Sequence, residues 1–135
     1  MPEKKKLFVS VPMKDRTEEA IKNSITKMHK MAELILTEEL ELIESYVPEH
    51  PADNKDAVKY LGEAIEKMSE ADYVIGLAEI EHSNGCLIER EVALRYGIPY
   101  VRAFAEQVAP DIIVALQRAQ QNQQTIQDVN FDGLM

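Results

Sequence analysis

Polar and reactive side chains gather in residues 83–91, which read Ser-Asn-Gly-Cys-Leu-Ile-Glu-Arg-Glu and follow the apolar run 73–78. The glycine and its polar neighbours predict a turn that opens a helix. When a strand of an open α/β sheet feeds such a turn, the turn lies outside the carboxyl end of the strand, where these sheets bind their ligands. We therefore look for catalytic side chains in this segment.

Glu89 is the candidate catalytic residue. At about 100° per residue, the apolar stripe of the predicted helix comprises Ile88, Val92 and Tyr96, with Ala93 at its margin. Glu89 falls on the inward side of this helix, whereas Arg90 and Glu91 project elsewhere. A carboxylate at this edge can attack or stabilise an electron-poor carbon, as in glycosyl transfer. Geometry leaves open a structural role, in which a backbone or arginine partner satisfies a partly buried acid.

A second loop, residues 10–17, reads Ser-Val-Pro-Met-Lys-Asp-Arg-Thr and follows the first predicted strand. It offers the hydroxyls of Ser10 and Thr17, the charges of Lys14 and Arg16, and backbone N–H groups at a helix N-terminus. These groups suit an anion or sugar-hydroxyl site. The glycine spacing of a Walker loop or of a dinucleotide fingerprint is missing.

The histidines and the single cysteine give weaker signals. His29, His50 and His82 have no metal-ligand spacing, and Cys86 has no second thiol beside it, so we expect no metal site. Cys86 could be a thiol nucleophile, but the sequence favours a small buried residue.

Apolar runs and helical periodicities alternate along the chain. Strands are predicted at residues 6–12, 41–47, 72–78 and 100–104, and helices at about 15–36, 55–69, 84–97 and 110–127. This alternation predicts an α/β fold, a single-domain flavodoxin-like or Rossmann-like parallel sheet of four or five strands with helices on both faces. The domain is expected to span residues 1–135, with about 128–135 as a tail or subunit contact.

Composition limits the classes of function. The 135 residues fit one domain, and a net charge of −9 argues against binding a nucleic acid polymer. No apolar run approaches the roughly 18 residues of a membrane span, and the N-terminus lacks the features of a signal peptide. One cysteine fits a reducing compartment, so a cytoplasmic protein without membrane contact is expected.

Three segments carry a resemblance to a known family. They are Phe-Val-Ser-Val-Pro-Met at 8–13, Ala-Asp-Tyr-Val-Ile-Gly at 71–76, and Asn-Gly-Cys-Leu-Ile-Glu-Arg-Glu-Val-Ala at 84–93, with Tyr-Gly-Ile-Pro at 96–99. The chain resembles the nucleoside 2-deoxyribosyltransferase-like superfamily, including its small phage and bacterial members, and is similar to the nucleoside 5′-monophosphate N-glycosidases. The third segment is the specific one, with a glycine turn, a glutamate four residues before a helix alanine, and a Gly-x-Pro stop.

The resemblance implies a mechanism and a site. Glu89 would be the nucleophile that attacks the anomeric carbon, releases the base and forms a glycosyl-enzyme, which a second base or water then resolves. No cofactor or metal is implied. The resemblance and the loop chemistry together place substrate contacts at Ser10, Pro12, Met13, Lys14, Ser83, Asn84 and Gly85.

Two positions depart from the family pattern. Ser83 stands where the transferases tend to carry an aspartate, and a serine there helps to hold the phosphate in the N-glycosidases, which favours a nucleotide or hydrolysis over base exchange. Ala64 stands where the family's supporting aspartate would lie. Without a general acid for the leaving base, the rate would fall by roughly 10²–10⁴.

Three hypotheses follow. The first is an enzyme that cleaves or transfers at the N-glycosidic bond of a (deoxy)nucleoside or its 5′-monophosphate. The second is a non-catalytic nucleotide-binding or sequestering protein on the same scaffold, and the third is an interaction module with a vestigial crevice. The resemblance also implies a homo-oligomer, dimer or higher, in which the tail at 131–135 completes a neighbour's pocket.

Overall fold

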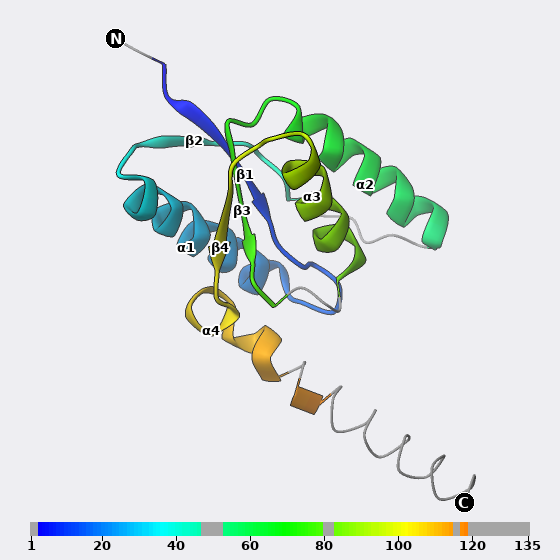
Figure 1. Ribbon diagram of the computed structural model, residues 1–135. Helices are drawn as coiled ribbons and strands as arrows, with labels where there is room; N and C mark the ends of the chain where they lie inside the picture. The colour runs from blue at the N-terminus through cyan, green and yellow to red at the C-terminus, as the bar shows by residue number, and fades with distance from the viewer. Residues whose placement is uncertain (1–2, 47–52, 80–82, 115–116, 119–135) are drawn as a thin grey trace, which may run out of the picture.

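A four-stranded parallel sheet forms the centre of the molecule (Figure 1). The computed structural model describes residues 3–46, 53–79, 83–114 and 117–118. The strand order is β2-β1-β3-β4, and all three pairings are parallel. The predicted α/β class is confirmed for the described residues, with four strands. The expected tail at 128–135 lies outside them.

The strands keep three of the four predicted positions closely. Their bounds are β1 Lys5–Ser10, β2 Leu40–Leu42, β3 Tyr73–Leu77 and β4 Tyr100–Ala103. The second strand is much shorter than the predicted range 41–47. The Ile43 amide still donates to the Leu7 carbonyl at 2.9 Å, but beyond it Ser45 reaches β1 through its side chain, with Oγ donating to the Val9 carbonyl. Beyond Ile43, a side-chain hydrogen bond from Ser45 therefore replaces the backbone pairing between β2 and β1.

Each long helix begins at a polar capping residue. The helices are α1 Glu18–Leu36, α2 Asn54–Met68, α3 Asn84–Arg95 and α4 Ala105–Val108. Thr17, Asp53 and Ser83 cap the first three, each accepting a hydrogen bond from a backbone N–H of the first turn. The first helix thus begins at a Thr17 cap and not at Asp15, which has a positive φ of 60°. None of the described helices has the length and apolar character needed to cross a bilayer.

The chain after β4 differs from the prediction of one long helix. The short α4 is an additional element, and a helical segment follows at 110–114, where the predicted last helix begins. Helical spacing in the predicted last helix places Ile112, Ile113, Leu116 and Ala119 inward. Ile112 is buried and Ile113 packs against the core. Leu116 and Ala119 lie outside the described residues.

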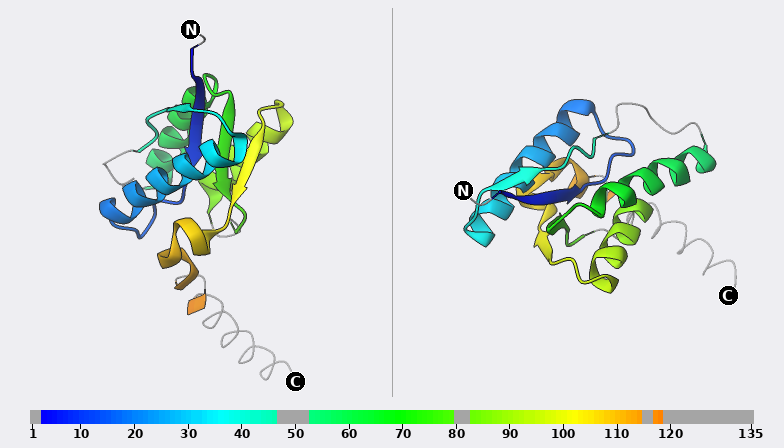
Figure 2. Two further views of the ribbon diagram at one scale, coloured as in Figure 1. Left: turned by 90° about the vertical axis from the view of Figure 1, so that its left-hand side faces the viewer. Right: turned by 90° about the horizontal axis from the view of Figure 1, so that it is seen from above.

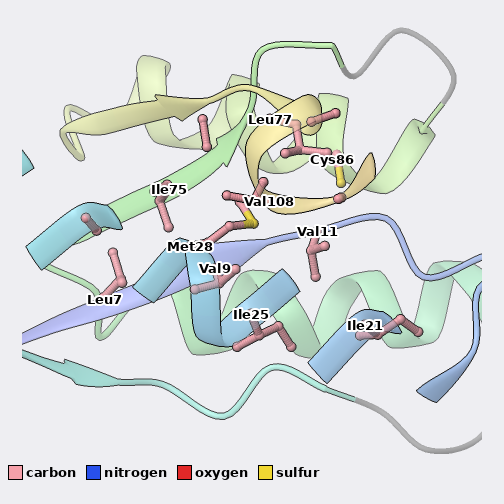
Figure 3. Packing of buried hydrophobic residues seen from close by; sticks show 14 of the residues in the cluster. Leu7, Val9, Val11, Ile21, Ile25, Met28, Ile75, Leu77, Cys86 and Val108 are labelled. Carbon is pink, nitrogen blue, oxygen red and sulfur yellow. The ribbon is translucent and has the colours of Figure 1, made fainter. Parts of the chain in front are cut away.

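The helices cover both faces of the sheet, α1 on one side and α2 with α3 on the other (Figure 2). Alternation along β1 points Leu7 and Val9 toward α1, and Phe8 and Ser10 toward α3. The main core under α1 is built from aliphatic side chains of β1, β3 and α1 (Figure 3). A smaller cluster lies on the opposite face and contains Phe8, Ile43, Met68, Val74 and Ala93.

The face that α3 turns to the sheet is not the one predicted. Its buried residues are Cys86, Glu89 and Ala93, whereas Ile88 is 42% exposed and Tyr96 is 80% exposed. Apolar residues occur on both sides of this helix, so the periodicity does not determine its rotation. Helical spacing also predicts Ile35 of α1 and Val58 of α2 on the apolar stripes of their helices, but both are exposed. The inward position of Glu89 is confirmed.

Gly76 of β3 makes room for a tyrosine from the neighbouring strand. A Cβ at this position would overlap the Tyr100 hydroxyl oxygen and lie 2.8 Å from Cζ of the same ring. Both groups belong to the face covered by α3, where Tyr100 packs against the smaller cluster. A glycine inside a strand marks such a close approach.

We predict that Gly76→Ala destabilises the protein by about 1–3 kcal/mol, because the added methyl forces the packed Tyr100 ring aside. The measurement is the urea midpoint of unfolding. Gly62→Ala in α2 is the matched control, since nothing lies within 4 Å of its added Cβ. It should stabilise the helix by up to about 1 kcal/mol. Equal stability of the two variants would contradict this packing.

Candidate functional site

The site lies where the chain connections of the sheet change direction. From β1 the chain crosses through α1 to β2 at one edge, and from β3 it crosses through α3 toward β4 at the other. The loops after β1 and β3 therefore diverge between two neighbouring strands. Open α/β sheets bind ligands in the crevice at such a switch point. Ser10 is the last residue of β1, at this position.

A hydrogen bond between Ser10 and Glu89 joins the two predicted loops. Ser10 Oγ donates to Glu89 Oε1 at 2.7 Å, and the two residues are 1% and 9% exposed. Within the described chain, Ser10 is the one hydrogen-bonding partner of this carboxyl. A carboxylate has room for about four such bonds. Among the described residues, most of the accepting capacity of the buried Glu89 is thus unused.

Burial changes the acidity of this group. Removal from water raises the pKa of Glu89 from its ordinary value of 4.5 to about 7, against the opposing effect of the Ser10 hydroxyl, which favours the ionised form. Glu89 therefore exchanges its proton near neutral pH. A carboxyl in this state can accept or release a proton, and its ionised fraction can act as a nucleophile.

Two predicted members of the first loop have structural roles. The Arg16 guanidinium, 5% exposed, donates to Asp111 at 2.8 and 3.0 Å, to Ser24 Oγ at 2.7 Å and to the Pro12 carbonyl at 3.0 Å. Thr17 Oγ1 caps α1. Both groups are already engaged, so neither is free to bind an anion. Together they fix the path of the loop.

The remaining predicted residues of this loop differ in how far they are exposed to solvent. Lys14 is exposed, Pro12 is half-buried, and Met13 packs against the main core. Of the predicted set, the structure therefore brings Ser10 against Glu89 and leaves the Lys14 charge in solvent. The loop reaches the carboxyl through Ser10.

The second loop presents the N-terminus of α3. Ser83 is its N-cap and accepts from the Cys86 amide at 3.4 Å; Asn84 is exposed and Gly85 half-buried. The first turn of α3 carries no acidic residue, whereas that of α1 carries Glu18 and Glu19. Backbone N–H groups at a helix N-terminus attract anions, and neighbouring acids oppose this. The α3 end is the better anion site of the two.

Cys86 is a buried residue, 2% exposed, in agreement with the favoured interpretation. Burial and the neighbouring Glu89 raise the pKa of its thiol to about 11, so the sulfur stays protonated at neutral pH. Of the histidines, His29 pairs with the Leu40 carbonyl at 2.8 Å, while His50 and His82 lie outside the described residues.

Tyr100 and Arg90 are members of this region that the sequence does not predict. The Tyr100 hydroxyl oxygen and Arg90 Nε are the fully buried polar side-chain atoms without a partner in the described chain. Arg90 is half-buried, although the helical spacing predicts that it projects away from the core. The glycine at position 76, inside a strand, is the available sequence signal for a close approach here.

The position of the missing helper acid is occupied by an apolar contact. Ala64 packs against the smaller cluster that contains Ala93. Glu79, the last described acid before the α3 turn, accepts from the Ala105 amide at 2.7 Å. Within the described residues, no second carboxyl is hydrogen-bonded to Glu89.

Two shallow surface depressions lie at the opposite, amino edge of the sheet. One is lined by Glu3, Lys4, Lys6 and Glu41, and the other by Lys4, Glu33, Leu34, Thr37, Glu38 and Glu39. Both are open, and most of their lining side chains are charged. Neither touches the Ser10–Glu89 pair, so we base the site on the buried carboxyl.

Comparisons with protein-family models, with curated proteins and with solved structures found no significant match. The described residues share with flavodoxin-like and Rossmann-like folds a parallel sheet of order 2-1-3-4. The functional assignment therefore depends on the geometry of the site and on the sequence resemblance.

We predict that Glu89→Gln changes the pH dependence of stability. A pKa raised from 4.5 to about 7 means that the folded state holds its proton more tightly than the unfolded chain. The contribution of Glu89 to stability is therefore highest below pH 4.5 and falls as the pH rises to 7, by roughly 3 kcal/mol.

The measurement is urea unfolding of both proteins from pH 5 to pH 8. The glutamine side chain of the variant cannot ionise, so this protein should lose the decline and gain relative stability at pH 8. Glu91→Gln, on the exposed side of the same helix, is the control and should follow the wild type. Parallel curves for wild type and Glu89→Gln would show that Glu89 ionises freely in the folded protein.

Proposed function

We propose that this protein cleaves or transfers at the N-glycosidic bond of a (deoxy)nucleoside or nucleoside 5′-monophosphate, with Glu89 as nucleophile. The observation that carries the proposal is the buried Ser10–Glu89 hydrogen bond at the switch point of the sheet. The bonded carboxyl lies at the edge where α/β sheets bind ligands, and Ser10 is its one hydrogen-bonding partner among the described residues. The family resemblance of residues 84–93 supplies the reaction class.

The reaction is a double displacement at the anomeric carbon. An ionised Glu89 oxygen attacks C1′ while the C1′–N bond breaks, and the electron pair of that bond leaves with the base. The product is a glycosyl ester of Glu89. Water then attacks C1′ in hydrolysis, or a second base attacks it in transfer, while the C1′–O bond to Glu89 breaks and the carboxylate is regenerated. The proton lost by the water or by the second base passes to the base that departed. Ser10 holds Oε1 through its hydroxyl, which orients the carboxylate for attack.

The N-terminus of α3 suits a 5′-phosphate. Ser83, Asn84 and Gly85 begin this helix, and its first turn has no acid to repel an anion. Lys14, on the loop after β1, is exposed and would supply a positive charge if it turned toward the same group. These features favour a nucleotide over a nucleoside as substrate.

The reaction should accelerate as the pH rises through 7. Only ionised Glu89 can attack, and with a pKa of about 7 about a tenth of the molecules are ionised at pH 6. Burial thus reduces the amount of active carboxylate at low pH. It also leaves that carboxylate poorly solvated and more reactive when it forms.

One observation favours a second candidate function, nucleotide binding without turnover. Ala64 offers no proton for the leaving base, and no second carboxyl among the described residues bonds to Glu89. A protein of this kind would hold the nucleotide and release no product. Thermal stabilisation by a nucleotide in the absence of any product would support this candidate.

We predict that a panel of nucleosides and nucleoside 5′-monophosphates contains a substrate whose free base is released. The measurement is chromatography of the free base from pH 5.5 to pH 8.5, where the rate should rise with a midpoint near 7. Glu89→Gln should lower the rate at least about 10³-fold, because the amide cannot form the ester.

Glu91→Gln is the matched control and should retain the wild-type rate, since Glu91 is exposed and pairs with Arg95. Base release that persists in Glu89→Gln would refute the nucleophile. A nucleotide that raises the melting temperature and yields no base would select the second candidate.

A further inference from the structure

The Tyr100 hydroxyl lies beside the Ser10–Glu89 pair on the same face of the sheet. The hydroxyl occupies the space above Gly76, which has no side chain to exclude it. Gly76 is the direct register partner of Ser10 across the β1–β3 ladder. Neighbouring strands are about 4.8 Å apart, so the hydroxyl and Ser10 stand next to each other in one row across the sheet.

This hydroxyl is buried and has no hydrogen-bonding partner within the described chain. Leaving a buried polar group unsatisfied destabilises the folded state, so such a group calls for a specific explanation. The Glu89 carboxyl in the same row has one partner and unused accepting capacity. Within the described chain, the Tyr100 hydroxyl therefore lacks an acceptor, and the adjoining Glu89 carboxyl can accept more hydrogen bonds than it receives.

We propose that Tyr100 is a positioning residue, whose hydroxyl donates the second hydrogen bond to Glu89 when that carboxyl is ionised. A small rotation of the Glu89 side chain would bring an oxygen toward the hydroxyl that lies above Gly76. With Ser10 and Tyr100 both donating, the attacking carboxylate would be held from two strands. The catalytic meaning of this contact rests on the proposed function, but the contact itself does not.

Other charged and titratable groups surround the same row. Those that act on Tyr100 or Cys86 are Cys86, Glu89 and Arg90 of α3, Arg102 of β4 and Arg16 of the first loop. Arg16 is held by Asp111. Arg90 Nε is also without a partner among the described residues, but it lies on a side chain with more rotatable bonds than that of Tyr100, whose ring packs into the space over Gly76. Tyr100 is therefore the better-defined donor.

The test is a direct titration of Glu89 by carbon-13 NMR of the labelled carboxyl, with Glu89→Gln used to assign its signal. Tyr100→Phe should raise the midpoint by about one pH unit, because the ionised form loses a donor. Tyr96→Phe is the control, since that side chain is 80% exposed, and it should leave the midpoint unchanged.

The fold should tolerate Tyr100→Phe, because the ring remains and an unsatisfied atom is removed. A second measurement is the stability of this variant relative to wild type, which should be higher at pH 5 and lose that advantage by pH 8. A purely structural role for Tyr100 would give the same difference at both pH values. An unchanged Glu89 midpoint, or a difference in stability that does not vary with pH, would overturn the proposal.

These outcomes are separable from those of the proposed function. A shifted midpoint in a protein that releases no base would retain the Tyr100–Glu89 contact and reject the enzyme. If the protein releases base but Tyr100→Phe leaves the titration midpoint of Glu89 unchanged, the enzymatic function is supported and the Tyr100–Glu89 contact is rejected.

Discussion

The hydrogen bond from Ser10 to Glu89 is the contact on which the site depends. It joins the end of β1 to the middle of α3, two elements whose bonded residues are 79 positions apart in the chain. A buried carboxyl is costly to ionise, and one neutral donor offsets only part of that cost. The pKa of about 7 is the result. This balance keeps Glu89 close to the point at which it changes charge in a neutral solution.

The surrounding structure maintains this contact from both sides. Arg16 and Thr17 fix the loop after β1 through the Asp111 ion pair and the α1 cap, which keeps the end of β1 in place. On the other side, the small residue Ala93 lets α3 lie close to the sheet. Arg16 and Thr17 resemble ligand-binding residues in the sequence, but in the structure they stabilise the backbone that carries the Ser10–Glu89 pair.

The architecture could be predicted well from the sequence because its signals are strong and local. Apolar runs locate β1, β3 and β4, with Pro12 after the first and Pro99 before the last, and helical spacing places Glu89 on the inward side of α3. The predicted rotation of α3 is wrong because apolar residues on both of its sides make the period ambiguous. The length of β2 depends on long-range pairing at the sheet edge, which no local pattern encodes.

The roles that the sequence does not predict within the site also depend on contacts between residues far apart in the chain. Tyr100 reaches the surroundings of Glu89 only because β4 lies beside β3 and Gly76 leaves a slot, a fact of strand order and register. Arg16 cannot be distinguished from a free anion-binding charge without knowledge of Asp111, 95 residues away. Residue types and spacing therefore locate the carboxyl, and the tertiary contacts determine which neighbours act on it.

The most direct measurement of the central claim is to trap the sugar on the protein. A reaction with a nucleoside 5′-monophosphate that releases base would be quenched in acid and digested, and the peptides would be read by mass spectrometry. If Glu89 is the nucleophile, the peptide that contains Glu89 carries a (deoxy)pentosyl 5-phosphate ester, and this ester is missing from the Glu89→Gln variant. A glycosyl group on another residue, or base release that proceeds equally well in the Glu89→Gln variant, would contradict it.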